Sequence, residues 1–89
     1  MSIDLRAIEA RIREGIVTTT GYEGPLASDQ SLRLAAVFDS YNVIELVVYL
    51  EQVFGVRIES DDMVESTFES INSLMSFIAS KQRAEAAAA

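Results

Sequence analysis

The sequence predicts an all-α protein: a bundle of four helices, with a long loop between the first two and a short third helix. Three observations support this fold class. Apolar residues recur at helical spacing in three segments, and the central segment runs for fifteen residues without a turn signal. The only proline lies in the stretch from Thr18 to Phe38, among glycines and serines, which marks a long connection.

The central segment, Ser40 to Phe54, contains five β-branched residues but is too long for a typical strand. At about 100° per residue, its apolar side chains fall on one broad arc, with Glu45 and Gln52 opposite. We therefore predict a helix of roughly 22 Å that buries its main face. The residues on this arc are Val43, Leu46, Val47, Leu50, Val53 and Phe54.

The start of this helix has two interpretations. Asp39 and Ser40 are preferred N-cap residues, because a short side chain with an oxygen atom satisfies free backbone N–H groups. Asn42 followed by Glu45 is also a capping-box pattern. With Asn42 as the cap, Ser40 would lie in the preceding loop with its hydroxyl free.

The first helix is predicted from Ile3 to about Val17, with the chain leaving helical structure before Gly21. The following connection is unusually long for a compact domain, so we expect apolar side chains to fix it to the core. The stripe of the first helix is Leu5, Ile8, Ile12 and Ile16, and the residues expected to hold the connection are Leu26, Leu32, Leu34 and Phe38.

A short third helix is predicted over roughly Asp61 to Ser66, with Ser60 as its N-cap. We predict that Ser70 caps a fourth helix, which buries a face made of Ile71, Leu74, Met75 and Ile78. With 89 residues we expect a single domain over residues 1–83, followed by an alanine-rich tail over 84–89.

The net charge of −7 argues against a nucleic-acid partner, since such binding uses Lys and Arg at phosphates. Eight acids and only one base, Arg57, lie between Asp39 and Glu69. This excess either keeps the protein soluble or forms a surface for basic partners. Because it coincides with the Ser40 helix, we favour the second interpretation.

The chain lacks cysteine and histidine, so the common nucleophile–base pairs are absent and we expect no catalytic activity. No apolar run reaches about 20 residues, so we expect no membrane span. Without cysteines there is no disulfide framework, and we expect no metal site. The sequence also shows no signal peptide, so we expect a cytoplasmic protein.

The stretch that begins Asp39-Ser40 and continues through Glu45-Leu46-Val47, Leu50-Glu51 and Phe54-Gly55-Val56 resembles the acyl carrier protein family. The resemblance aligns without gaps from Asp39 to about Asp62, and more loosely from Met1 to Lys81. Two positions depart from the family. Tyr41 stands where the family usually has Leu or Met, and Val37-Phe38 precede the aspartate where a glycine is common.

The resemblance implies that Ser40 carries a covalent 4′-phosphopantetheine, with Asp39 as its motif neighbour. The thiol of this cofactor would hold an acyl group as a thioester. The implied partners are a phosphopantetheinyl transferase, an acyl- or aminoacyl-loading ligase and acyl-transferring enzymes with basic docking surfaces, and we expect a monomer.

The helix after Ser40 carries the expected partner surface. Tyr41, Ile44 and Val48 fall within about 60° of one another, off the core arc and beside Glu45 and Glu51. Ile44, Glu45, Val48 and Glu51 match positions at which the family docks its enzymes. The alternative is that a wider arc of this helix is buried beneath the long connection.

We therefore predict a carrier of acyl groups in fatty acid, polyketide or related biosynthesis. The alternative in the same class is an aminoacyl, D-alanyl or peptidyl carrier, suggested by the Val37-Phe38-Asp39-Ser40 opening. An unmodified acidic helical interaction module is the alternative of another class, if Ser40 is only a cap.

Overall fold

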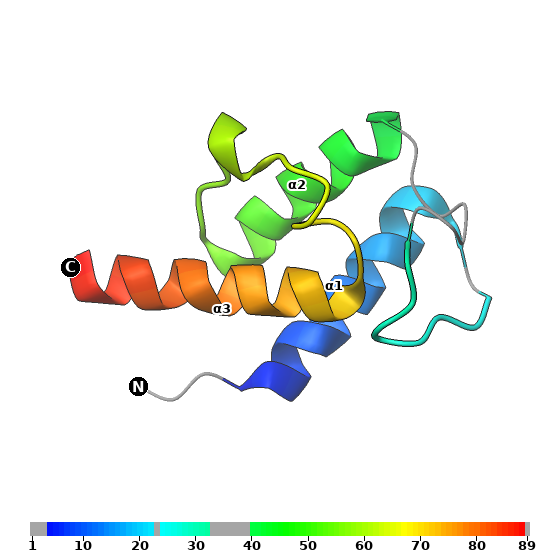
Figure 1. Ribbon diagram of the computed structural model, residues 1–89, viewed down its shortest axis with the longest axis horizontal. Helices are drawn as coiled ribbons and strands as arrows, with labels where there is room; N and C mark the ends of the chain where they lie inside the picture. Colours follow the sequence, from blue (N-terminus) through cyan, green and yellow to red (C-terminus); the bar gives the residue numbers. More distant parts are fainter. Residues whose placement is uncertain (1–3, 23, 33–39, 89) are drawn as a thin grey trace.

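The computed structural model describes residues 4–22, 24–32 and 40–88. Within these ranges the chain forms α1 (Leu5–Thr20), α2 (Ser40–Phe54), the 3-10 helix η1 (Ser60–Asp62) and α3 (Ile71–Ala88), and no strand. Helix α1 packs against both α2 and α3 (Figure 1). The predicted all-α bundle with a long first connection is confirmed.

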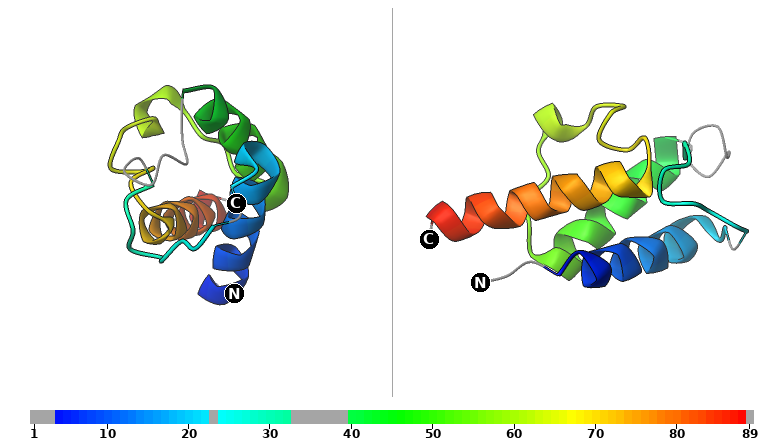
Figure 2. Two further views of the ribbon diagram at one scale, coloured as in Figure 1. Left: turned by 90° about the vertical axis from the view of Figure 1, so that its right-hand side faces the viewer. Right: turned by 60° about the horizontal axis from the view of Figure 1, so that its bottom comes forward.

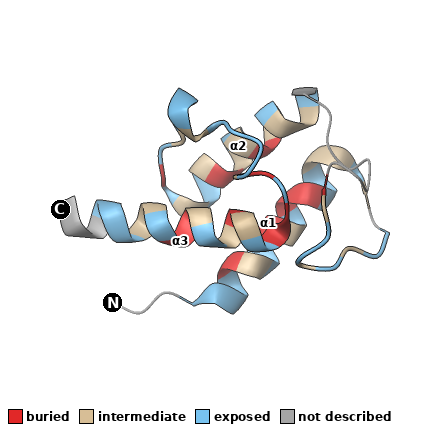
Figure 3. Cartoon of the chain, viewed as in Figure 1, coloured by how far each residue is buried: buried red, intermediate tan, exposed pale blue. Residues whose placement is uncertain are grey.

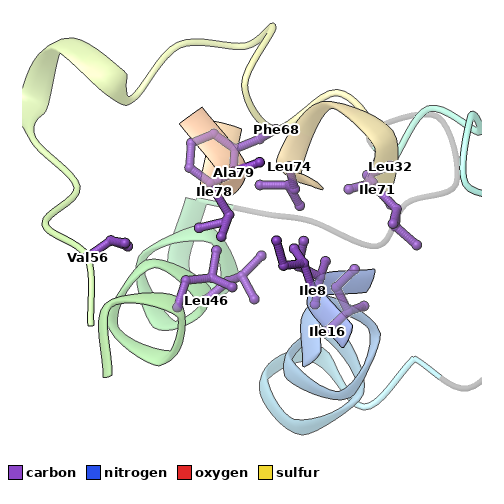
Figure 4. Close-up of a cluster of buried hydrophobic side chains, with 12 residues drawn as sticks. Ile8, Ile16, Leu32, Leu46, Val56, Phe68, Ile71, Leu74, Ile78 and Ala79 are labelled. Atoms are coloured by element: carbon purple, nitrogen blue, oxygen red, sulfur yellow. The ribbon is translucent and has the colours of Figure 1, made fainter. Parts of the chain in front are cut away.

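The core lies where the three α-helices face one another, and side chains from each of them point into it (Figure 4). Leu46 and Leu50 of α2 are fully buried, as the helical arc predicted. Val53 is 36% exposed, so its predicted place in the core is wrong. The buried cluster consists of Ile8, Ile12, Ile16, Leu32, Leu46, Leu50, Val56, Phe68, Ile71, Leu74, Ile78 and Ala79.

Helix α1 begins after Asp4, whose side chain accepts hydrogen bonds from two N–H groups of the first turn. It continues to Thr20 and not only to Val17. The Thr19 and Thr20 hydroxyls donate to the carbonyls of the preceding turn at 2.8 and 2.6 Å, which accommodates these β-branched residues within the helix. Gly21 then ends it with a φ of 74°.

The buried stripe of α1 is shorter at its start than predicted. Ile8, Ile12 and Ile16 are buried, but Leu5 is 48% exposed because it occupies the first helical position, at the edge of the bundle. Ile3, where the helix was expected to begin, lies outside the described residues.

The connection between α1 and α2 is attached to the start of α3 as well as to α1 (Figure 2). Leu32 is fully buried, and its N–H donates to the Glu69 carbonyl at 2.8 Å. Leu26 is partly buried against the core, as expected. Leu34 and Phe38, the other two residues predicted to hold the connection, lie outside the described residues.

The predicted third helix is a single 3-10 turn, η1, and does not extend to Ser66. Glu59, and not Ser60, occupies its N-cap position, and the Glu59 N–H donates to Asp62 Oδ2 at 2.9 Å. A longer helix would need an apolar face to bury, whereas the next two residues, Met63 and Val64, are exposed. Turns lead from there to α3.

An ion pair ties η1 to α3. Lys81 Nζ lies 2.6 Å from Asp62 Oδ2, and both side chains are about three-quarters covered. The hydrogen bond from Lys81 lowers the pKa of Asp62, and the same bond raises the pKa of Lys81. Of the adjacent acids Asp61 and Asp62, Asp62 therefore uses its carboxylate within the protein, whereas Asp61 is exposed.

Helix α3 is capped by Ser70, as predicted: the Ser73 N–H donates to Ser70 Oγ at 3.1 Å. Its last turns extend past the other helices (Figures 1 and 2). Residues 84–88 continue the helix, and the division into a domain over 1–83 and a tail over 84–89 stays a prediction. No described helix combines the length and the apolar character needed to cross a membrane.

The contact between α1 and α2 is closest at Gly15. A Cβ atom at this position would lie 2.5 Å from Tyr49 Cδ1 and Cε1, and 3.1 Å from Leu46 Cδ1. The Tyr49 ring is partly buried against the core, so it fills the space that any other residue at position 15 would need. The absence of a side chain at Gly15 therefore lets α2 approach α1 at this point.

We predict that Gly15→Ala lowers the stability of the protein, although alanine is the better helix former by about 1 kcal/mol. The added methyl group must displace the Tyr49 ring or separate the helices, and such overpacking typically costs 1–3 kcal/mol. Thermal unfolding followed by circular dichroism should show a lower Tm.

Tyr49→Leu provides the control. In a Tyr49→Leu background, Gly15→Ala should lower the stability much less than it does in the original protein, because the smaller side chain leaves room for the methyl group. A Gly15→Ala protein at least as stable as the original would show that the two helices do not depend on this contact.

Candidate functional site

Ser40 is the first residue of α2, so the helix starts two residues before Asn42. Asn42 therefore lies in the first turn, and its predicted alternative role as the N-cap is wrong. A helix N-terminus carries partial positive charge and free N–H groups, which favour an anion such as a phosphate. Asp39 and the hydroxyl of Ser40 lie outside the described part of the structure.

Three exposed apolar residues of α2 lie in the helical turns that follow Ser40. Tyr41 is 68% exposed, Ile44 59% and Val48 48%. Figure 3 shows exposed and buried positions alternating along α2. Leu46 and Leu50, on the opposite side of the helix, are fully buried. We call Tyr41, Ile44 and Val48 the α2 patch. The structure thus leaves this side of the helix uncovered, so α2 is not buried all round.

Glu45 lies beside the α2 patch, one helical turn after Tyr41. Its carboxylate accepts a hydrogen bond from the Tyr41 hydroxyl, and this bond, together with the negative charge, raises the pKa of Tyr41. The phenol therefore stays protonated well above neutral pH. The start of α2 presents an exposed aromatic ring next to a carboxylate that is only half exposed.

Glu51, the second acid assigned to the partner surface, also has an internal role. Its Oε2 atom accepts a hydrogen bond of 2.9 Å from the Ile58 N–H, in the segment that follows α2. The Arg57 N–H similarly donates to Glu85 Oε1 of α3 at 3.3 Å. Sequence reasoning did not foresee these two bonds, because both acids bind backbone groups whose positions depend on the folded chain.

Sequence reasoning also missed a cluster on α1. Arg13 lies off the apolar stripe of α1, and its guanidinium binds Leu26 O and Ser28 Oγ of the long connection at 2.7 and 3.0 Å. The pattern of α1 alone contains no signal for these contacts. Among the residues that the structure describes, no three His, Cys, Asp or Glu side chains gather closely enough to hold a metal ion.

A family model described as phosphopantetheine attachment site matches residues 10–78, which include α2 and most of α1. The chain belongs to this family. It is therefore a carrier protein of the class that holds 4′-phosphopantetheine covalently on a serine. A search of curated proteins found no significant match.

The match covers the elements that position the start of α2. Its range begins within α1, includes the long connection and Ser40, and ends at the buried Ile78 of α3. The helices around Ser40 and the core that holds them thus belong to one family unit. Carriers of this class are generally non-catalytic and depend on a transferase and on acyl-handling enzymes.

We predict that aspartate substitutions separate the two faces of α2. Leu46→Asp would bury an unpaired charge at a cost of several kcal/mol. Because a domain of this size has a stability of about 5 kcal/mol, this variant should be largely unfolded. Val48→Asp should change stability by about 0.5 kcal/mol or less, since Val48 is exposed.

Circular dichroism during heating measures both effects. Equal destabilisation by the two substitutions would contradict the exposure of the α2 patch. A folded Val48→Asp protein is also the reagent for asking whether partner enzymes use this patch, because it places a charge there without disturbing the core.

Proposed function

We propose that Ser40 is the attachment site of 4′-phosphopantetheine and that the protein carries an acyl group as a thioester on this arm. The supporting observation is the position of Ser40 as the first residue of α2, within the range matched by the family. It follows an aspartate in the sequence, and the exposed α2 patch begins at the next residue.

The residues at the start of α2 fit the proposed group. A phosphodiester is anionic, and the dipole and N–H groups of the helix N-terminus stabilise an anion there. Once bound, the arm supplies a terminal thiol that forms thioesters, a chemistry that this cysteine-free chain lacks. The chain itself holds the serine at a helix start and needs no general base, since a separate transferase activates the hydroxyl.

The proposed docking face consists of the α2 patch with Glu45 and Glu51 at its edge. An apolar centre with a charged rim is the usual composition of a protein interface. The excess of acids between Asp39 and Glu69 favours partners with basic surfaces. These partners are the phosphopantetheinyl transferase, a loading ligase and the enzymes that take the acyl group.

We predict that Ser40→Ala remains folded but gains no prosthetic group. Ser40 is the first residue of α2, where alanine is a good helix former, so the substitution should cost about 1 kcal/mol or less. Intact mass after coexpression with a promiscuous phosphopantetheinyl transferase should show the added group on the original protein and not on the variant. Attachment to Ser28, Ser60 or Ser70 would rule out Ser40 as the site.

A charge reversal tests the docking face. Glu45→Lys should slow association with the transferase and weaken its dependence on salt, because an attractive charge becomes repulsive. Glu14→Lys on α1 changes the net charge equally at an exposed residue outside α2 and serves as the control. Stopped-flow association rates at several ionic strengths measure the effect.

Glu45 is preferred to Glu51 for this experiment, because reversing Glu51 would also break its bond to the Ile58 N–H. If Glu45→Lys and Glu14→Lys slow association equally, the effect is one of net charge, and Glu45 has no specific contact with the partner.

A further inference from the structure

Arg13 uses all three nitrogens of its guanidinium, and two of them link α1 to the long connection. Nη1 donates to the Leu26 carbonyl at 2.7 Å, and Nη2 donates to Ser28 Oγ at 3.0 Å. Nε donates to Glu9 Oε2 at 2.9 Å, one turn earlier on the same helix. The planar fork of an arginine suits this arrangement, since its donors point in fixed and different directions.

Glu9 and Ser28 complete the cluster. Ser28 Oγ donates to Glu9 Oε2 at 3.1 Å, so that Glu9, Arg13 and Ser28 are bonded in a closed triangle, which we call the Arg13 clamp. The hydrogen bond from Arg13, and then that from Ser28, lowers the pKa of Glu9. The carboxylate is therefore ionised at neutral pH and can accept both hydrogen bonds there.

The same stretch of chain is fixed on its other side by backbone bonds. The Asn72 N–H at the start of α3 donates to the Ser28 carbonyl at 2.9 Å, and the Leu32 N–H donates to the Glu69 carbonyl at 2.8 Å. Residues 26–32 thus bridge α1 and the start of α3, and Leu32 is fully buried. Leu32 precedes Ser40 by only eight residues.

The Arg13 clamp is more than an ordinary exposed ion pair between two residues of one helix. The Arg13 and Glu9 side chains are 38% and 32% exposed, and such pairs contribute little to stability on their own. Two of the three acceptors of Arg13 lie 13 and 15 residues away, in the connection. The cluster therefore holds the connection, which leads from Leu32 to the proposed attachment site.

We propose that Arg13 is a positioning residue for the modification of Ser40. The Arg13 clamp holds residues 26–32 in one arrangement, and the transferase recognises the Ser40 region in that arrangement. Without the clamp residues 26–32 sample other arrangements, and only the fraction of molecules in the recognised arrangement binds productively. The apparent affinity of the transferase for the carrier falls in proportion to that fraction. The rate of modification of the bound carrier, kcat, changes little.

This inference rests on the proposed function, because it assumes that Ser40 receives the group. The experiment measures kcat and KM for a purified phosphopantetheinyl transferase with coenzyme A and the unmodified carrier, followed by intact mass. The variants are Arg13→Gln, Arg13→Lys and the control Arg6→Gln, which removes the same charge from an exposed position of the same helix. Each is first shown by circular dichroism to be folded at the assay temperature.

Arg13→Gln should raise KM for the carrier about fivefold and leave kcat nearly unchanged, which corresponds to the recognised arrangement being populated about one-fifth of the time. Arg6→Gln should behave as the original protein. Arg13→Lys should resemble Arg13→Gln, because an ammonium group at the end of a flexible chain cannot reach three acceptors in different directions.

Hydrogen exchange separates positioning from general destabilisation. In Arg13→Gln the amides of Leu32 and Asn72 should exchange faster, whereas those of the buried Leu46 and Leu50 in α2 should not. Equal acceleration at all four amides would mean that the substitution weakens the whole domain, and this would overturn the proposal.

Two further results are decisive. An unchanged KM in Arg13→Gln, with Leu32 exchanging faster, would show that the transferase ignores the state of the connection. A failure of the original protein to gain the group would instead contradict the proposed function itself, so the two ideas fail in different ways.

Discussion

The arrangement of this bundle depends on the close contact between α1 and α2 at Gly15. Because residue 15 has no side chain, the Tyr49 ring and Leu46 can lie directly against α1. This contact fixes the rotation of α2 about its own axis, and the rotation decides which residues meet the core. Ile44 and Val48 remain exposed for that reason, although their side chains are as apolar as those of the buried residues. The surface that follows Ser40 is thus a consequence of packing on the other side of the helix.

The helical segments could be predicted because hydrophobic periodicity is a local property. It gave the buried faces of α2 and α3 and the Ser70 cap. Errors arose where tertiary contacts or side-chain hydrogen bonds determine the residue at which a helix ends. Thr19 and Thr20 stay helical through bonds to the preceding turn, and η1 is short because Met63 and Val64 have nothing to bury against. Val53 lies at the edge of the apolar arc predicted for α2. The rest of the protein covers only part of that arc, so Val53 stays exposed.

The sequence also suggested the candidate site, which stays a prediction. A serine after an aspartate, followed by a helix of the right pattern, was enough to suggest Ser40 and the residues beside it. The contacts of Arg13 and Glu51 were not predictable, because their acceptors are backbone groups and a serine brought near by the fold. The acids of this chain therefore have two kinds of role. Some, such as Asp62 and Glu9, bind within the protein, and Glu45 lies at the edge of the exposed patch.

The bonds that hold the long connection join residues far apart in the sequence. Asn72 follows Ser28 by 44 residues, and Glu69 follows Leu32 by 37. Closing such loops costs chain entropy before any contact compensates for it, so these bonds form late in folding. During synthesis on the ribosome they cannot form until the start of α3 has emerged, long after Ser40 itself has left the exit tunnel. In a nascent chain Ser40 therefore emerges before the start of α3 is available to bind residues 28 and 32 of the long connection.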